Sequence, residues 1–190
     1  MKQWKYKDSA DYEEHQILAN IKKIDWVWME ASTAQRIQYR FKSASSILCH
    51  GARNGTEIEY FRKYYGLDTK IMGTDISPTA IDFKDMVQWD MQKPNEHWIG
   101  KWDIVYSNSF DHCNDPKKCV KTWTDQVSPD GILVVEIPTG ENNFSTVMDP
   151  LMISKSEFLE MIEPHGFKLV NEFYVDAKLG SSRVLLCKKI

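Results

Sequence analysis

The stretch that decides the fold is SILCHGARNG, residues 46–55. Its first half is a short apolar strand pattern, and its second half is a turn with glycines at positions 51 and 55. The helical pattern TEIEYFRKYYG follows at once, with Thr56 and Glu59 at the spacing of a capping box and Gly66 as its stop. A strand, a glycine turn and a helix in this order are typical of a parallel sheet whose backbone lies against a ligand.

Strand and helix patterns alternate from this turn to the C-terminus. The expected strands are KIMGTD (70–75), MVQW (86–89), WDIVYS (102–107), ILVVEIP (132–138), FKLVNEFYV (167–175) and SSRVLLCKK (181–189). The expected helices are SPTAIDFK (77–84), DPKKCVKTWTDQV (115–127) and SKSEFLEMIEPHG (154–166), with SPDG (128–131) as a turn. This alternation predicts an α/β fold with a doubly wound, mostly parallel sheet. The last two strands have no helix between them, so they form an antiparallel hairpin.

The first 45 residues have a different pattern. Residues 10–40 are helical in character, with a break at Asp25-Trp26 before a second helix through Ile37. We interpret residues 1–45 as an N-terminal helical extension and residues 46–190 as the domain. Trp26, Trp28 and Met29 either form an apolar face packed on the domain or belong to a lid over a ligand.

Composition excludes several classes of protein. The chain has 190 residues and a formal net charge of -3, which disfavours a nucleic-acid or membrane-surface binder. Its four cysteines form no CxxC pair, and no apolar signal segment is present, so we expect reduced cysteines and a cytoplasmic location. His112, Cys113 and Cys119 lack a suitably spaced fourth ligand, so no metal site is expected. The oligomeric state is not indicated.

Polar residues follow several of the expected strands. Asp75 ends the second strand, Asp90 follows the third, and Ser107-Asn108 end the fourth. In an open α/β sheet the ligand lies at these carboxyl ends. Asp75 could accept hydrogen bonds from a ribose diol and Asp90 from an adenine amine. Each could alternatively be a turn, capping or solvated carboxylate, but their order favours a nucleoside site.

Taken together, residues 46–190 resemble the class I S-adenosylmethionine-dependent methyltransferase family. ILCHGARNG resembles its first motif, IMGTDISPTAI its second and VQWDM its third. Residues 102–138 resemble its fourth strand, active-site loop, next helix and fifth strand. The resemblance implies a Rossmann-like sheet of seven strands in the order 3-2-1-4-5-7-6 between two helical layers. It also implies S-adenosylmethionine as cofactor and S-adenosylhomocysteine as product.

The resemblance also implies the residues that bind the cofactor. They are Gly51, Ala52, Arg53, Asn54, Gly55, Asp75, Ile76, Asp90, Met91, Ser107 and Asn108, with Ile76 and Met91 beside the adenine. Two positions depart from the pattern: Cys49 stands where the family often has an acid, and Arg53 where it has a glycine. Arg53 could pair with the methionine carboxylate or with Glu57.

Methyl transfer from a sulfonium is an in-line displacement, so an acceptor that carries a proton needs a base. His112, with Asp111 beside it, follows the fourth strand and is the expected catalytic pair; the alternative is that His112 packs against the next helix. Glu136 and the PTGENNF loop (138–144) could contact the acceptor. We expect a small molecule or a surface-presented group as acceptor, without membrane or nucleic acid.

Two other functions remain open from the sequence. One is a non-catalytic relative that binds an adenosyl ligand. The other is a nucleotide-dependent oxidoreductase, which is less compatible because Arg53 and Thr56 occupy glycine positions of the dinucleotide pattern.

Overall fold

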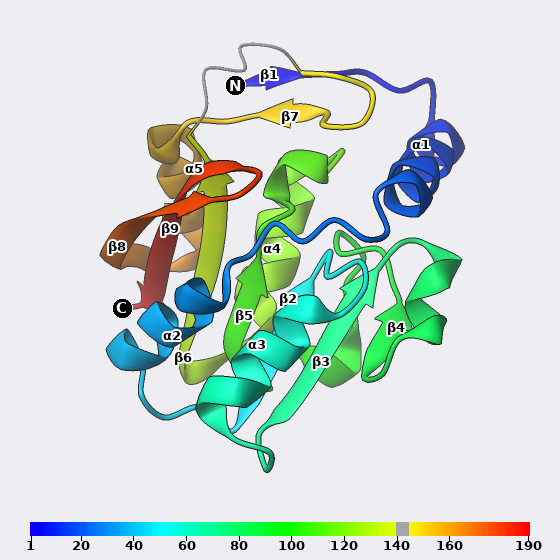
Figure 1. Ribbon diagram of the computed structural model, residues 1–190. Helices are drawn as coiled ribbons and strands as arrows, with labels where there is room; N and C mark the ends of the chain where they lie inside the picture. Colours follow the sequence, from blue (N-terminus) through cyan, green and yellow to red (C-terminus); the bar gives the residue numbers. More distant parts are fainter. Residues whose placement is uncertain (140–144) are drawn as a thin grey trace.

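A seven-stranded sheet forms the centre of the computed structural model, which describes residues 1–139 and 145–190 (Figure 1). Its strands are β2 (Ser46–His50), β3 (Lys70–Asp75), β4 (Met86–Gln88), β5 (Trp102–Ser107), β6 (Val127–Pro138), β8 (Phe167–Ala177) and β9 (Gly180–Lys189). They lie in the order β4-β3-β2-β5-β6-β9-β8. Strand β9 is antiparallel to β6 and β8, and the other pairs are parallel. The expected order and closing hairpin are confirmed.

Helices cover both faces of the sheet (Figure 1). One apolar cluster includes residues of α2 (Ala31–Arg40) and α3 (Thr56–Tyr65), and a second includes residues of α4 (Pro116–Gln126) and α5 (Lys155–Ile162). Alternate residues of β5 enter the two clusters, which explains its nearly continuous apolar sequence. Four short 3-10 helices complete the connections: η1 (Pro78–Asp82), η2 (Glu96–Trp98), η3 (Phe110–His112) and η4 (Glu163–His165).

The N-terminal segment, residues 1–30, lies at the end of the sheet to which the parallel strands point (Figure 1). It contains β1 (Lys2–Gln3), which pairs with β7 (Leu151–Met152), and α1 (Ser9–Lys22). The second helix begins at Ala31 rather than near Trp26, so residues 26–30 are not helical. No helix in the described part of the chain is long and apolar enough to span a membrane.

The turn after β2 has an unusual backbone. Gly51, Arg53 and Gly55 have φ angles of 68°, 42° and 75°, in the left-handed region where glycine is the least strained residue. The expected capping box on α3 is wrong. Its N-cap is Gly55, and the Asn54 carboxamide oxygen accepts hydrogen bonds from the Thr56 amide and hydroxyl at 3.2 and 2.8 Å. The sharp change from strand to helix favours glycine over a side-chain cap.

The expected SPDG turn is also wrong, because residues 128–131 lie within β6. Trp102 pairs with Val127 and Ile104 with Ile132. One residue of β5 therefore faces four residues of β6, which bulge out of the ladder.

His50 is buried at the end of β2. Its Nδ1 lies 2.9 Å from the Thr74 hydroxyl and its Nε2 lies 2.7 Å from Gln126 Oε1, while its ring stacks on Trp123. Because an amide oxygen only accepts, Nε2 carries the proton and Nδ1 accepts from Thr74. Burial lowers the pKa of His50 to about 4, so the folded protein keeps this ring neutral.

We expect His50→Asn to reduce the acid sensitivity of the fold. Below the unfolded pKa of 6.5 the unfolded chain binds a proton that folded His50 rejects, so stability falls until pH reaches the folded value of about 4. At about pH 4.5 this loss is about 2.5 kcal/mol. Urea unfolding of both proteins at about pH 7 and about pH 4.5 measures the difference. An identical pH dependence in the two proteins would contradict the assignment.

Candidate functional site

Two cavities meet at the carboxyl ends of the parallel strands. The smaller, of about 50 Å³, lies under α1 and beside the ends of β2 and β3. The larger is a cleft of about 1090 Å³ that extends along the ends of β5 and β6 to the β8–β9 hairpin. Gly51, Arg53, Ser109 and His112 line both cavities, so the two form one continuous site around the turn after β2.

The two acids predicted to hold a nucleoside line the same small cavity. Asp75 accepts hydrogen bonds from the Ser77 and Arg53 amides at 2.9 and 3.2 Å, which fix its carboxyl group. Burial raises its pKa, and these bonds oppose that shift. Asp90 accepts from the Gln92 amide at 2.9 Å. Ile76 and Met91 line the cavity next to the two acids.

The helix α1 supplies a wall of the small cavity that sequence reasoning missed. Tyr12, Gln16, Ala19 and Asn20 line it, at the spacing of one helix face. Asn20 Oδ1 accepts from the Thr79 hydroxyl at 3.0 Å, and its buried amide group lies toward the Asp75 carboxyl group, whose pKa it lowers.

Trp89 also lines the small cavity and was not predicted, although it directly precedes Asp90 in the sequence. Its indole nitrogen donates to the Lys93 carbonyl at 2.9 Å. Aromatic and apolar groups beside Asp90 suit a planar heterocycle.

The turn residues divide into two groups. Gly51 and Arg53 line the cavities, whereas Ala52, Asn54 and Gly55 do not. Asn54 holds the N-terminal segment, because its amide donates to the Ile24 carbonyl at 2.8 Å.

Arg53 points toward the same N-terminal segment. One Nη donates to the Trp26 carbonyl at 2.9 Å, which leaves other guanidinium donors for a ligand. The positive charge of Arg53 opposes the pKa elevation of both Asp75 and Glu57, so it acts on acids in both cavities.

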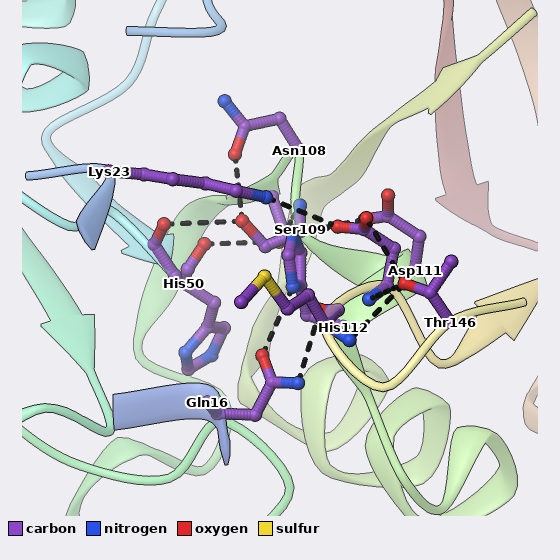
Figure 2. Close-up of polar contacts among 12 residues, drawn as sticks. Gln16, Lys23, His50, Asn108, Ser109, Asp111, His112 and Thr146 are labelled. Atoms are coloured by element: carbon purple, nitrogen blue, oxygen red, sulfur yellow. Dashed lines mark hydrogen bonds and ion pairs between the residues drawn. The ribbon is translucent and has the colours of Figure 1, made fainter. Parts of the chain in front are cut away.

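The loop after β5 packs against the glycine turn. Ser107 is buried and lines neither cavity; its hydroxyl donates to the His50 carbonyl and accepts from the Ser109 amide, both at 3.0 Å. Asn108 lines the larger cavity, and its Oδ1 accepts from the Ser109 hydroxyl at 3.0 Å (Figure 2). Ser107 therefore shapes the loop that presents Asn108.

His112 lies where the two cavities join, opposite α1. Its Nδ1 is 3.1 Å from Gln16 Oε1, and its Nε2 is 3.6 Å from Asp149 and 3.9 Å from Asp111 (Figure 2). Lys23 lies 3.6 Å from the same Asp149 oxygen and balances this negative charge.

Asp111 lies beside His112, as expected. Its Oδ1 is buried without a hydrogen bond among the described residues, and burial raises its pKa. Asp111, His112 and Asp149 together offer three potential metal-ligand atoms within 4.8 Å of one another. The neighbouring Lys23 already supplies a positive charge to this group.

Two buried carboxyl groups line the larger cavity. Glu136 accepts hydrogen bonds from Tyr106 at 2.8 Å and from Ser182, and burial raises its pKa. Glu57, in the first turn of α3, accepts from the Asn108 amide at 3.1 Å, and burial raises its pKa to about 7. Glu136 was an expected acceptor contact, whereas Glu57 was considered only as a partner for Arg53. Residues 140–144 of the PTGENNF loop lie outside the described residues.

Comparison with known proteins gives this site a family context. Residues 48–135 match the family model described as a methyltransferase domain. No protein with a curated description matches the sequence.

Solved structures share the fold over almost the whole chain. The 1,6-didemethyltoxoflavin-N1-methyltransferase of Burkholderia thailandensis, with 1,6-didemethyltoxoflavin and S-adenosylhomocysteine bound, matches with a TM-score of 0.73 and 13% identity, covering 98% of this chain and 93% of that one. A TehB-like SAM-dependent methyltransferase from Corynebacterium glutamicum matches with a TM-score of 0.65 and 17% identity, over 96% and 100%. The [4+2]-cyclase SpnF matches with a TM-score of 0.73 and 11% identity, over 99% and 98%.

We expect Gly51→Ala to be more destabilising than Gly100→Ala. Both glycines have φ angles in the left-handed region, 68° and 64°. A Cβ on Gly51 would lie 2.5 Å from Ser109 Cβ, whereas one on Gly100 would meet nothing within 4 Å. Gly100→Ala should cost about 1–2 kcal/mol from the backbone alone, and Gly51→Ala more. Denaturant unfolding measures both, and equal losses would rule out the steric contribution.

Proposed function

We propose that this chain, whose residues 48–135 match a methyltransferase-domain model, is a class I S-adenosylmethionine-dependent methyltransferase that transfers a methyl group to a small molecule. Loss of the methyl group converts S-adenosylmethionine into S-adenosylhomocysteine. The observation that carries this proposal is that Asp75 and Asp90 line one cavity, which continues past Gly51 into a large cleft. The residues that line the small cavity suit the adenosine end of the cofactor, and the cleft suits the acceptor.

The residues around the small cavity fit an adenosine. The carboxylate of Asp75 is held by hydrogen bonds from the Arg53 and Ser77 backbone amides, in a position that suits the ribose hydroxyls. Asp90, with Met91 and Ile76, offers a carboxylate and apolar surface to the purine. Gly51 lines the cavity without a side chain, and a Cβ at this position would collide with Ser109. We assign residues 1–45 as the extension that closes this cavity, because Asn20 and its neighbours on α1 line it.

The cleft suits an organic acceptor of moderate size. Its volume of about 1090 Å³ is that of a site for a small molecule. Trp28, Ile137 and Leu179 give it apolar surface, and Glu136 adds a polar group. The similar Burkholderia enzyme is named for a small heterocyclic acceptor.

The bound cofactor supplies an activated methyl group for in-line displacement, so the protein has mainly to align the acceptor and exclude water. His112 is the proposed base. Gln16 Nε2 donates to the Met148 carbonyl at 3.2 Å, so its Oε1 faces His112. This oxygen accepts a hydrogen bond from His112 Nδ1, which therefore carries the ring proton. In the neutral ring Nε2 then carries the lone pair.

A proton accepted at Nε2 is close to two negative charges. Asp149 and Asp111 lie 3.6 and 3.9 Å from this nitrogen. Their carboxylates favour the positive charge that forms when an acceptor O–H or N–H gives up its proton.

Two alternatives remain to be distinguished by measurement. A protein that binds the adenosyl ligand without turnover would retain affinity and show no methyl transfer. The [4+2]-cyclase with the same fold illustrates why turnover must be measured, since a fold does not determine a reaction. A nucleotide-dependent oxidoreductase would bind a nicotinamide dinucleotide instead.

We expect wild-type protein to bind S-adenosylmethionine and S-adenosylhomocysteine, and Asp75→Asn to bind both at least about tenfold more weakly. The substitution removes the charge that accepts from the ribose while keeping the side-chain shape. Asp82→Asn, an exposed change nearby, is the matched control and should have no effect. Isothermal titration calorimetry, with NAD as a second ligand control, gives the affinities. Absence of binding by the wild type would refute the proposed function.

We expect His112→Gln to lower kcat about a hundredfold or more while S-adenosylhomocysteine affinity changes little. A panel of phenols and N–H heterocycles, screened for S-adenosylhomocysteine formation, identifies an acceptor for this test. The loss should shrink as pH rises, because the acceptor then loses its own proton to water. Full activity of the variant would leave His112 a packing residue beside Gln16.

A further inference from the structure

Glu57, one of the residues that line the larger cavity, has a carboxylate oxygen without a hydrogen-bond partner in the described part of the chain. Glu57 is only 6% exposed, and its Oε1 accepts from Asn108 Nδ2 at 3.1 Å. Its Oε2 is buried and has no hydrogen bond among the described residues. Leaving a buried carboxyl oxygen unpaired costs free energy, so this oxygen is suited to a ligand group that donates hydrogen bonds.

Glu57 is held in place from two directions. Asn108 cannot turn its amide away, because its Oδ1 accepts from the Ser109 hydroxyl at 3.0 Å while its Nδ2 donates to Glu57. The first turn of α3 fixes the backbone of Glu57 directly after the glycine turn. Glu57 and Asn108 both line the larger cavity, next to the Gly51 and Arg53 positions that join it to the smaller one.

Arg53 adds the opposite charge at the same place. Its positive charge opposes the raised pKa of both Glu57 and Asp75, and Arg53 lines both cavities. The guanidinium makes one hydrogen bond within the described residues, to the Trp26 carbonyl. An acid and a guanidinium that line the same cavity match the zwitterion of an α-amino acid.

We propose that Glu57, oriented by Asn108, binds the α-ammonium group of an α-amino acid ligand whose carboxylate faces Arg53. This inference rests on the proposed function, in which that ligand is the methionine end of the cofactor. The adenosine end then occupies the cavity of Asp75, and the chain of the ligand passes Gly51. Glu57 is thus a cofactor-binding residue that the strand-end pattern does not include.

The charge on Glu57 makes the affinity depend on pH. The groups that face it are Arg53 on the turn, Asn108 and Tyr106 from β5 and its loop, Glu136 on β6 and Cys49 on β2. The pKa of Glu57 is raised to about 7, mainly by burial and slightly by Glu136, against the opposing effects of its own backbone amide, Asn108 and Arg53. Below this value Glu57 must lose a proton before it can bind an ammonium group, so affinity falls as pH decreases.

The test compares two ligands that differ in the amino acid. S-adenosylhomocysteine carries it, and 5′-methylthioadenosine has the same nucleoside and sulfur without it. We expect Glu57→Gln to weaken S-adenosylhomocysteine binding about tenfold to a hundredfold and methylthioadenosine binding less than about twofold. Glu59→Gln, an equal charge change in the same helical turn on an exposed side chain, is the matched control and should change neither.

A second measurement uses the unmodified protein, so it does not depend on a variant that folds. S-adenosylhomocysteine affinity should be about tenfold weaker at about pH 6 than at about pH 8, while methylthioadenosine affinity stays constant. Glu57→Asp should keep the pH dependence, and Glu57→Gln should remove it.

The outcomes separate this inference from the proposed function. If the wild type binds neither adenosyl compound, both fail. If it binds both compounds, and Glu57→Gln weakens them equally or not at all, only the role of Glu57 fails. If the affinities for S-adenosylhomocysteine and methylthioadenosine changed equally with pH, the role of Glu57 would also be refuted.

Discussion

The parallel pairing of β2 with its two neighbours is the constraint on which the site depends. His50 pairs with Thr74 on β3 and with Ser107 on β5. The next residue of each strand is therefore Gly51, Asp75 and Asn108, and the three lie side by side at the edge of the sheet. Since parallel strands end at the same edge, one register brings a backbone turn, a carboxylate and an amide together. A shift by one residue would exchange buried and exposed side chains along the whole strand.

The sequence was sufficient to predict the strand order of the sheet and the acids at its edge. Buried parallel strands have apolar runs that are easy to recognise, and Asp75 and Asp90 follow such runs directly. Local turn chemistry was less predictable. Thr56 and Glu59 have the spacing of a capping box, but the backbone at Gly55 already has the left-handed angle that ends the turn, so the side-chain cap is not formed. Residues 128–131 have a turn composition, yet the pairing on both sides keeps them within β6.

Contacts that join distant segments could not be predicted at all. Helix α1 has the pattern of an ordinary amphipathic helix, and nothing in that pattern says that Gln16 and Asn20 face a cavity. Glu57 looks like the acid that often stabilises the first turn of a helix through the macrodipole. Its unpaired oxygen becomes visible only when Asn108, 51 residues away, is placed beside it. Buried Cys49 supplies no carboxyl group at the end of β2, so Glu57 brings negative charge to the turn from the other side.

The N-terminal segment links the two ends of the site. Asn20 and Gln16 lie on the same helix; Asn20 reaches Thr79 beside the proposed ribose site, while Gln16 faces Nδ1 of His112. Gln16 also donates to the Met148 carbonyl, so the position of α1 fixes the orientation of its amide. The position of α1 that lines the proposed adenosine site also presents Gln16 Oε1 to His112 Nδ1, which leaves the lone pair of the ring on Nε2. The ring would lose this preferred tautomer if α1 moved away, because both nitrogens could then carry the proton. A single helix therefore contacts both the proposed nucleoside site, through Asn20, and the proposed base, through Gln16.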